Sequence, residues 1–155
     1  MPIPPFVVEL RSMIGTHELW LPGVTAVIRR GDELLLTRRA DNGEWSPVTG
    51  IVDPGEEPAV SAAREALEEA GVEVTVDRLA SVGAIPDVVY ENGDRAAYLD
   101  LTFGCTWVSG EARVADDENV DVRWWPISDL PAMSSSIRRR IDDVLAEEAA
   151  ARFRV

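Results

Sequence analysis

The chain has 155 residues and a formal net charge of −13 at pH 7, with 28 acidic residues against 15 basic ones, all of them arginine. Hydrophobic residues make up 46% and charged residues 28%, which is ordinary globular usage and excludes wholesale disorder. Such a negative field repels a polyphosphate backbone, which argues against non-specific binding to nucleic acid. It also repels a small anionic substrate, unless some of the acids hold a metal ion that reverses the local charge.

The length and the cysteine content indicate one domain from a reducing compartment. A chain of this size fits a single domain over residues 1–155 with one full core. Cys105 is the only cysteine, so no intrachain disulfide can form, and its apolar neighbours favour a buried strand position. The N-terminus lacks the features of a signal peptide, and no segment approaches the ~20 apolar residues of a membrane span. We expect a cytoplasmic protein with no membrane partner.

Hydrophobic spacing predicts an alternation of helices and strands in chain order. Segments with a helical period predict helices at residues 6–14, at 58–70 and at 134–153, the first forming an N-terminal extension over residues 1–16. Apolar or alternating runs predict strands at 19–21, 24–30, 34–39, 46–52, 72–76, 79–85, 96–108 and 120–125, with Pro86 as a break. Helices placed before, between and after strands predict an α/β fold, in which helices cover a sheet.

The central helix carries an unusual group of acids. At 100° per residue, Val60, Ala63, Leu67 and Ala70 form one face, and Glu65, Glu68 and Glu69 project from the other side. One interpretation is a solvated acidic face with an Arg64–Glu68 pair at i, i+4. However, Glu65 and Glu69 are like charges at i, i+4, which destabilise a helix, and clustered carboxylates are what a hard divalent cation needs. Spacing alone leaves the two interpretations open.

The residues around this helix resemble the signature box of the Nudix hydrolases. Five residues separate Gly50 from Glu56, and seven separate Glu56 from Arg64-Glu65. The pairs Glu68-Glu69 and Gly71-Val72 complete the match. The surroundings are similar as well, with Arg38-Arg39 and Trp45 before the box and Trp124-Trp125-Pro126 after it. Two positions depart from the pattern: Ala66 replaces a larger aliphatic residue, and Pro47-Val48-Thr49 replaces a common Leu-Pro-Gly.

The resemblance implies a fold, a reaction and a cofactor. The fold would be an α/β/α sandwich with a mixed sheet, in which the box forms a loop-helix-loop. The reaction would be hydrolysis, by water attack at phosphorus, of a nucleoside diphosphate linked to another group. ADP-ribose-like compounds and nucleoside triphosphates compete as substrates. The cofactor would be Mg²⁺, with Mn²⁺ as an alternative, because it neutralises charge on the phosphates.

The same resemblance assigns roles to individual residues. The metal ligands would be Glu65, Glu68 and Glu69 with the carbonyl of Gly50. Arg64 would orient these carboxylates, by pairing with Glu56. The catalytic base would be a box glutamate such as Glu69 or an acid on a later loop, where Glu118 is favoured as that base or as an additional metal ligand. A solvated acidic turn at Asp116-Asp117-Glu118 is an equal alternative.

Substrate contacts are less well specified by the sequence. Trp20, Tyr90, Tyr98 and Phe103 offer rings for stacking on a nucleobase, although strand aromatics more often fill a core. Of these we select Tyr98 and Phe103. Arg38 and Arg39 are candidates for contact with a phosphate or a ribose, with a solvent-facing position at the strand end as the alternative. Pro86, fifteen residues after Gly71, stands near an offset that resembles members that cleave ADP-ribose, or it simply ends a strand.

Three further expectations concern rival functions and partners. A non-catalytic nucleotide-binding regulator with the same fold is the main alternative, although such a protein is expected to lose box glutamates that this chain keeps. An acidic module that binds a protein partner is a third. The apolar stripe of residues 6–14, together with the strand at Trp20, predicts a homodimer, while packing of the stripe on its own sheet is the competing outcome.

Overall fold

A mixed β-sheet forms the centre of the molecule in a computed structural model that describes residues 3–155. Its strands are β1 (Leu19–Arg30), β2 (Glu33–Arg39), β3 (Trp45–Ser46), β4 (Val48–Ile51), β5 (Glu73–Val89), β6 (Arg95–Ser109) and β7 (Asn119–Pro126). The order is β3-β2-β1-β6-β5, with β4 paired to β1 and β7 to β2. Strands β1 and β6 run parallel and every other described pair is antiparallel.

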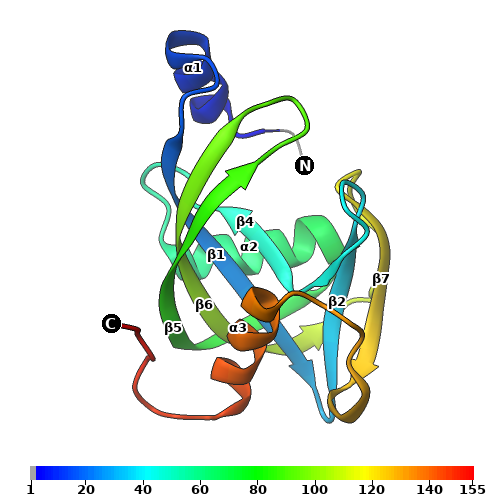
Figure 1. Cartoon of the computed structure of the whole chain (residues 1–155). Coiled ribbons are helices and arrows are strands. Elements are labelled where there is room, and N and C mark those ends of the chain that lie inside the picture. Colours follow the sequence, from blue (N-terminus) through cyan, green and yellow to red (C-terminus); the bar gives the residue numbers. More distant parts are fainter. Residues whose placement is uncertain (1–2) are drawn as a thin grey trace.

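Two helices cover the two faces of this sheet, as Figure 1 shows. Helix α2 (Pro58–Ala70) packs its alanines against Val24, Ala26 and Ile28 of β1. Helix α3 (Ser135–Leu145) packs Ile141 and its neighbours on the opposite face, against a cluster that includes Val27. Alternate residues of one strand therefore feed two cores, because successive side chains of a strand point to opposite faces. The predicted α/β/α sandwich with a mixed sheet is confirmed.

Helix α1 (Pro5–Ile14) lies at one end of the sheet, beside the tip of the β5–β6 hairpin (Figure 1). Phe6, Val7 and Leu10 pack in a third cluster with Leu19 and Leu21 of β1. The stripe predicted for residues 6–14 is thus largely covered by the chain's own sheet. Among residues 3–155, no helix is long and apolar enough to cross a membrane.

Pro86 does not end its strand. Strand β5 continues to Val89, with a shift of register between Ile85 and Val88 and a φ of +55° at Asp87. Proline lacks a backbone N–H, and an irregularity in the ladder is where a strand tolerates one. The sequence signal for an interruption was real, but the structure resolves it as a bulge.

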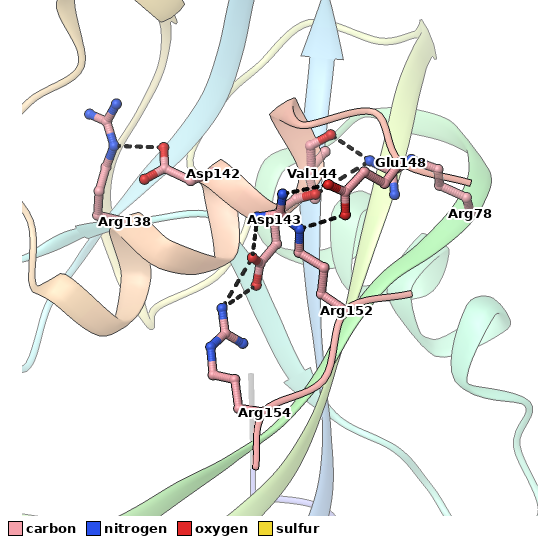
Figure 2. Close-up of polar contacts among 8 residues, drawn as sticks. All are labelled: Arg78, Arg138, Asp142, Asp143, Val144, Glu148, Arg152 and Arg154. Carbon is pink, nitrogen blue, oxygen red and sulfur yellow. Dashed lines mark hydrogen bonds and ion pairs between the residues drawn. The ribbon is translucent and has the colours of Figure 1, made fainter. Parts of the chain in front are cut away.

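The last helix is shorter than the predicted 134–153, because α3 ends at Leu145. Beyond it the chain turns back, and Arg152 pairs with β5: its N–H donates to the Ala80 carbonyl at 2.8 Å, and its carbonyl accepts from Val82 at 3.0 Å. Asp143, 2% exposed, accepts hydrogen bonds from the side chains of Arg152 and Arg154, as Figure 2 shows. These contacts override the helix propensity of the alanines in this segment.

Candidate active site

The box residues come from three consecutive segments: Gly50 lies in β4, Glu56 lies in the turn that follows, and the remaining acids lie in α2 with Arg64. Strand β4 leads through a turn into the helix, and Arg64 closes this turn: Nε and Nη2 each donate to one oxygen of Glu56 at 2.9 Å. The same guanidinium donates to Glu65 at 3.0 Å and to Glu68 at 3.1 Å. These bonds raise the pKa of Arg64, Glu56 contributing most, and lower that of Glu56. The structure thus contains the expected Arg64–Glu56 pair.

The face of α2 that packs on the sheet is not the predicted one. Val60 and Leu67 are 57% and 51% exposed, whereas Ala62, Ala66, Glu65 and Glu69 are buried. The predicted apolar face of Val60, Ala63, Leu67 and Ala70 is therefore wrong except at Ala70. Small alanines let the helix approach the sheet closely, and this approach carries two glutamates inward with them. A simple solvated acidic face is excluded for Glu65 and Glu69.

Glu65 is fully buried and lies against Gly50 of β4. Its Oε1 accepts from Arg64, whereas its Oε2 has no hydrogen-bond partner within the described part of the chain. Burial raises the pKa of Glu65 to about 7, against the opposing effect of Arg64. A buried carboxylate oxygen without a donor is costly, which makes it a fitting ligand for a cation.

Glu69, 3% exposed, is the centre of a second group of acids. Carboxylate oxygens of Glu69, Asp116 and Glu118 all lie within 4.8 Å of one another. Asn119 donates to Glu69 at 3.2 Å and to Asp116 at 3.3 Å. Burial raises the pKa of Glu69 to about 9, and the charges of Glu65, Glu118 and Asp116 act in the same direction.

The segment after β6 brings Asp116 and Glu118 to the helix. The N–H of Ala115 donates to the Glu69 carbonyl at 3.1 Å, and the N–H of Arg113 donates to the Ala70 carbonyl at 3.1 Å. Ala40 donates to the Glu118 carbonyl at 2.8 Å. Sequence reasoning favoured Glu118 on this loop but missed Asp116 and the bridging Asn119. A run of acids before a strand was the only available signal.

A bowl of about 770 Å³ opens on the α3 face of the sheet. Its lining includes Gly50 and Glu118 of the candidate site together with Arg39, Tyr98 and Arg140 of α3. The carboxylate group therefore borders a space large enough for a nucleotide-sized ligand.

The structure divides the predicted substrate-binding residues into two groups. Arg39 lines the bowl and donates to Asp41 at 3.0 and 2.7 Å; these bonds raise its pKa, and Glu118 and Glu69 add to the effect. Tyr98 also lines the bowl. Arg38 is exposed and donates to the Gly43 carbonyl at 3.1 Å, outside the bowl lining. Phe103, 7% exposed, packs in the α2-side core, where a base cannot stack on it.

Glu68 and Cys105 complete the placement of the predicted residues. The side chain of Glu68 is 42% exposed and bonds to Arg64, so it stands apart from the Glu69, Asp116 and Glu118 group. Cys105 is buried, as predicted, and burial raises its thiol pKa to about 12.

Comparison with known proteins places this site in a family. A NUDIX domain model matches residues 19–150. The chain belongs to the Nudix family. An NAD-capped RNA hydrolase of Pseudomonas aeruginosa is 35% identical over 135 residues, which are 84% of this chain and 46% of that protein. A MutT-like protein of Streptomyces ambofaciens is 36% identical over 108 residues, 70% of this chain and 63% of that protein.

Solved structures agree on the fold. A NUDIX hydrolase from Nitrosomonas europaea has a TM-score of 0.68 and 26% identity, covering 83% of this chain and 90% of that one. An ADP-ribose pyrophosphatase from Streptococcus suis has a TM-score of 0.65 and 20% identity, covering 85% and 96%. This Nudix chain spans about half the length of the NAD-capped RNA hydrolases that it matches.

The acidic side chains at this Nudix site offer only oxygen atoms as metal ligands, which suits a hard divalent cation. The unpaired Oε2 of Glu65 and the mutual repulsion of Glu69, Asp116 and Glu118 are what such an ion would relieve. The geometry of Glu69, Asp116 and Glu118 therefore fits a divalent metal.

Proposed function

We propose that this protein is a metal-dependent pyrophosphohydrolase that cleaves a nucleoside diphosphate linked to another group. The observation that carries the proposal is the set of buried carboxylates beside a nucleotide-sized bowl. Burying like charges costs free energy unless a cation compensates for it. For the stability of the fold alone, neutral side chains at the buried positions of Glu65 and Glu69 would serve better.

Mg²⁺ is the proposed ion, with Mn²⁺ as the alternative, held by Glu65, Glu69, the Gly50 carbonyl and the loop acid Asp116. Glu68, with its exposed carboxylate, remains a proposed ligand from the outer side. When bound, such an ion neutralises phosphate charge and stabilises the charge that develops on the leaving phosphate.

The chain's own residues supply positioning and proton transfer. Arg64, fixed by Glu56, holds the carboxyl groups of Glu65 and Glu68 in place. Glu118 belongs both to the carboxylate group and to the lining of the bowl. We propose Glu118 as the base that accepts a proton from the attacking water, with Glu69 as the alternative. Arg39 and Tyr98 would contact the substrate from the wall of the bowl.

The names of the relatives support this substrate class. Three proteins similar to this chain are named as an NAD-capped RNA hydrolase, an ADP-ribose pyrophosphatase and a UDP-X diphosphatase. Each of these substrates contains a nucleoside diphosphate joined to another group. Nucleoside triphosphates, the other substrate class that the resemblance of the box implies, remain the competing class. The cytoplasm remains the expected location.

A product-resolved hydrolysis screen with Mg²⁺ tests the proposal. The panel contains ADP-ribose, NAD, UDP-sugars and the nucleoside triphosphates, with the products separated by chromatography. A nucleoside monophosphate is expected from the hydrolysed class, and chelation is expected to abolish its release. Binding of a nucleotide without turnover at any metal concentration would contradict the proposal and support the non-catalytic regulator.

A further inference from the structure

Arg140 of α3 lines the same bowl as Glu118. Its side chain is only 14% exposed, although it carries a full charge. Nη1 lies 2.7 Å from the Thr25 hydroxyl and 3.7 Å from Oδ1 of Asp100. Arg140 and Asp100 both line the bowl. Arginines are mostly exposed to solvent, so a largely buried arginine such as Arg140 must have a role other than keeping the surface soluble.

A directed chain of hydrogen bonds fixes this arginine. The Thr25 hydroxyl has one hydrogen, which it uses to donate a hydrogen bond to Oδ1 of Asp100 at 2.7 Å. It therefore accepts the hydrogen bond from Arg140. Thr102 donates to the other oxygen of Asp100 at 2.7 Å, which holds the carboxylate in turn. Nε of Arg140 points to the Ser136 carbonyl at 3.4 Å. Nε and Nη1 are thus engaged, which leaves Nη2 as the donor for a ligand in the bowl.

The charges around Arg140 favour a neutral acceptor over an anion. Burial and the positive charge of Arg139 lower the pKa of Arg140, whereas Asp100 and Glu44 raise it, so the two carboxylates balance the two arginines. Glu44 also accepts from the backbone N–H of Ser134 at the start of α3, so it occupies the end of the helix where an anion would bind. A phosphate would therefore meet no net positive charge here, whereas a carbonyl oxygen would meet a single oriented donor.

Tyr98, which also lines the bowl, is two positions from Asp100 in β6, so its ring lies on the same face of the sheet as the carboxylate that Arg140 approaches. The Tyr98 ring lies so close to Gly23 that a Cβ at this glycine would be 3.3 Å from Cδ1 of the ring. The Tyr98 hydroxyl shares a hydrogen bond with that of Tyr90, which fixes the ring from its far end. A rigid aromatic ring and one charged donor in the same bowl are a combination that binds a nucleobase by stacking and by one polar edge.

We propose that Arg140 is a specificity-determining residue that donates a hydrogen bond from Nη2 to an oxo group of the substrate's nucleobase. Thr25 and Asp100 act as positioning residues. The inference rests on the proposed function, because it assigns the bowl to the nucleoside half of the substrate. Guanine, uracil and cytosine present an oxo oxygen, whereas adenine has an amino group where guanine has O6, and a guanidinium repels that donor. The protein therefore favours oxo-bearing bases.

Nucleotides that differ only in the base test the proposal by kinetics, within whichever class is hydrolysed. The guanine, uracil or cytosine compound is expected to have a KM about tenfold below that of the adenine compound, the range of a charged hydrogen bond. Arg140→Gln should raise KM about tenfold for the preferred base, leave adenine unchanged and alter kcat little. Arg138→Gln, at an exposed arginine of the same helix that pairs with Asp142, is the matched control and should keep the preference.

Thr25→Val tests the positioning chain without removing the arginine. Valine has nearly the shape of threonine but neither accepts from Arg140 nor donates to Asp100, so base preference should fall while thermal stability confirms folding. Thr25→Ser should restore the preference. This pair keeps the proposal testable if Arg140→Gln does not fold.

Calorimetric binding of GMP, UMP, CMP and AMP separates this inference from the proposed function, since it needs no turnover. Arg140-dependent preference for the oxo-bearing monophosphates without any hydrolysis would support the inference and overturn the proposed function. Hydrolysis with an Arg140→Gln effect equal for all four bases would overturn the inference alone. An effect that follows only the non-nucleoside half of the substrate would overturn it as well.

Discussion

A Cβ atom at Gly50 would lie 2.2 Å from the carboxyl carbon of Glu65. That distance leaves no room for any side chain on this residue of β4. The glutamate of the helix therefore fills the space that the glycine of the strand vacates, and the two positions of the box depend on each other. Position 50 requires glycine because it has no room for a side chain, and not because of its backbone conformation, since the φ of Gly50 is not positive.

Gly50→Ala should remove the response to metal while most of the fold survives. The added methyl group must displace the buried carboxylate of Glu65, which ceases to be a ligand. We expect a loss of at least about 10² in turnover, typical for loss of transition-state charge stabilisation, and no rise of the melting temperature with Mg²⁺. Gly83→Ala is the control, because a Cβ there meets nothing within 4 Å. Equal behaviour of the two variants would contradict the proposed site.

Divalent metal should stabilise the wild-type protein. A ligand that binds only the native state adds RT ln(1 + [L]/Kd) to the free energy of unfolding, about 2.7 kcal/mol at a hundredfold excess over Kd. Thermal melting in millimolar Mg²⁺, in Mn²⁺ and in chelator measures this. An unchanged midpoint in all three solutions would count against a metal site.

Glu69→Gln should abolish turnover and, without metal, raise the melting temperature. Because the folded protein raises the pKa of Glu69 to about 9, this carboxyl group takes up a proton on folding at pH 7, at a cost in free energy that a neutral amide of the same shape avoids, and Asn119 still has an oxygen to bond. A gain of 1 kcal/mol corresponds to about 2–4 °C for a chain of this size. Glu57→Gln, an exposed glutamate just before α2, should change neither property. A variant that kept near-normal rates would show that Glu69 holds no metal.

Asp143→Asn should weaken the attachment of the C-terminal segment. Burial disfavours the carboxylate of Asp143, but hydrogen bonds from Arg154, Ser81 and Arg152 outweigh this effect and hold its pKa below the usual value (Figure 2). At pH 7 we expect a loss of about 1–3 kcal/mol in the free energy of unfolding. Asp142→Asn, the neighbouring exposed acid in an i, i+4 pair with Arg138, should cost no more than about 0.5 kcal/mol.

The same aspartate gives a pH dependence with a definite sign. A carboxylate whose pKa is lower in the folded state contributes stability above its unfolded pKa of about 3.9, and this stability is lost as the pH falls through the folded value. The difference between wild type and Asp143→Asn should therefore be constant near neutrality and disappear in acid. Chemical denaturation from pH 7 down to pH 3 measures it. A difference that grew in acid would reverse the assigned role.

A homodimer is predicted from the apolar side chains that α1 and β1 leave exposed. Phe6, Val7 and Leu10 are covered by the chain's own sheet, but Met13 and Trp20 remain 66% and 61% exposed. Light scattering at tens of micromolar should give twice the chain mass for the intact protein and a monomer for Met13→Glu with Trp20→Glu. Val114→Glu, at an exposed valine outside α1 and β1, is the control. A monomeric wild type would refute the prediction.

The sequence determined the family, the order of most elements and the residues of the box. Local periodicity, glycine and proline positions and the spacing from Gly50 to Gly71 are properties of a short stretch of chain, and they predicted the position of α2 correctly. Local reasoning also misled, because helix periodicity counts apolar side chains and therefore placed Val60 and Leu67 inward. In the structure the alanines and two glutamates face the sheet instead.

Only the tertiary structure decided which distant residues meet. Asp116 and Asn119 reach Glu69 across about fifty positions of sequence, and Arg140 reaches Thr25 across 115, through pairings that no local pattern encodes. The end of α3 at Leu145 likewise depends on an edge of β5 that accepts the backbone of Arg152. Buried charge is the common reason: its cost is set by the groups that surround it in space, and these come from several strands and loops at once.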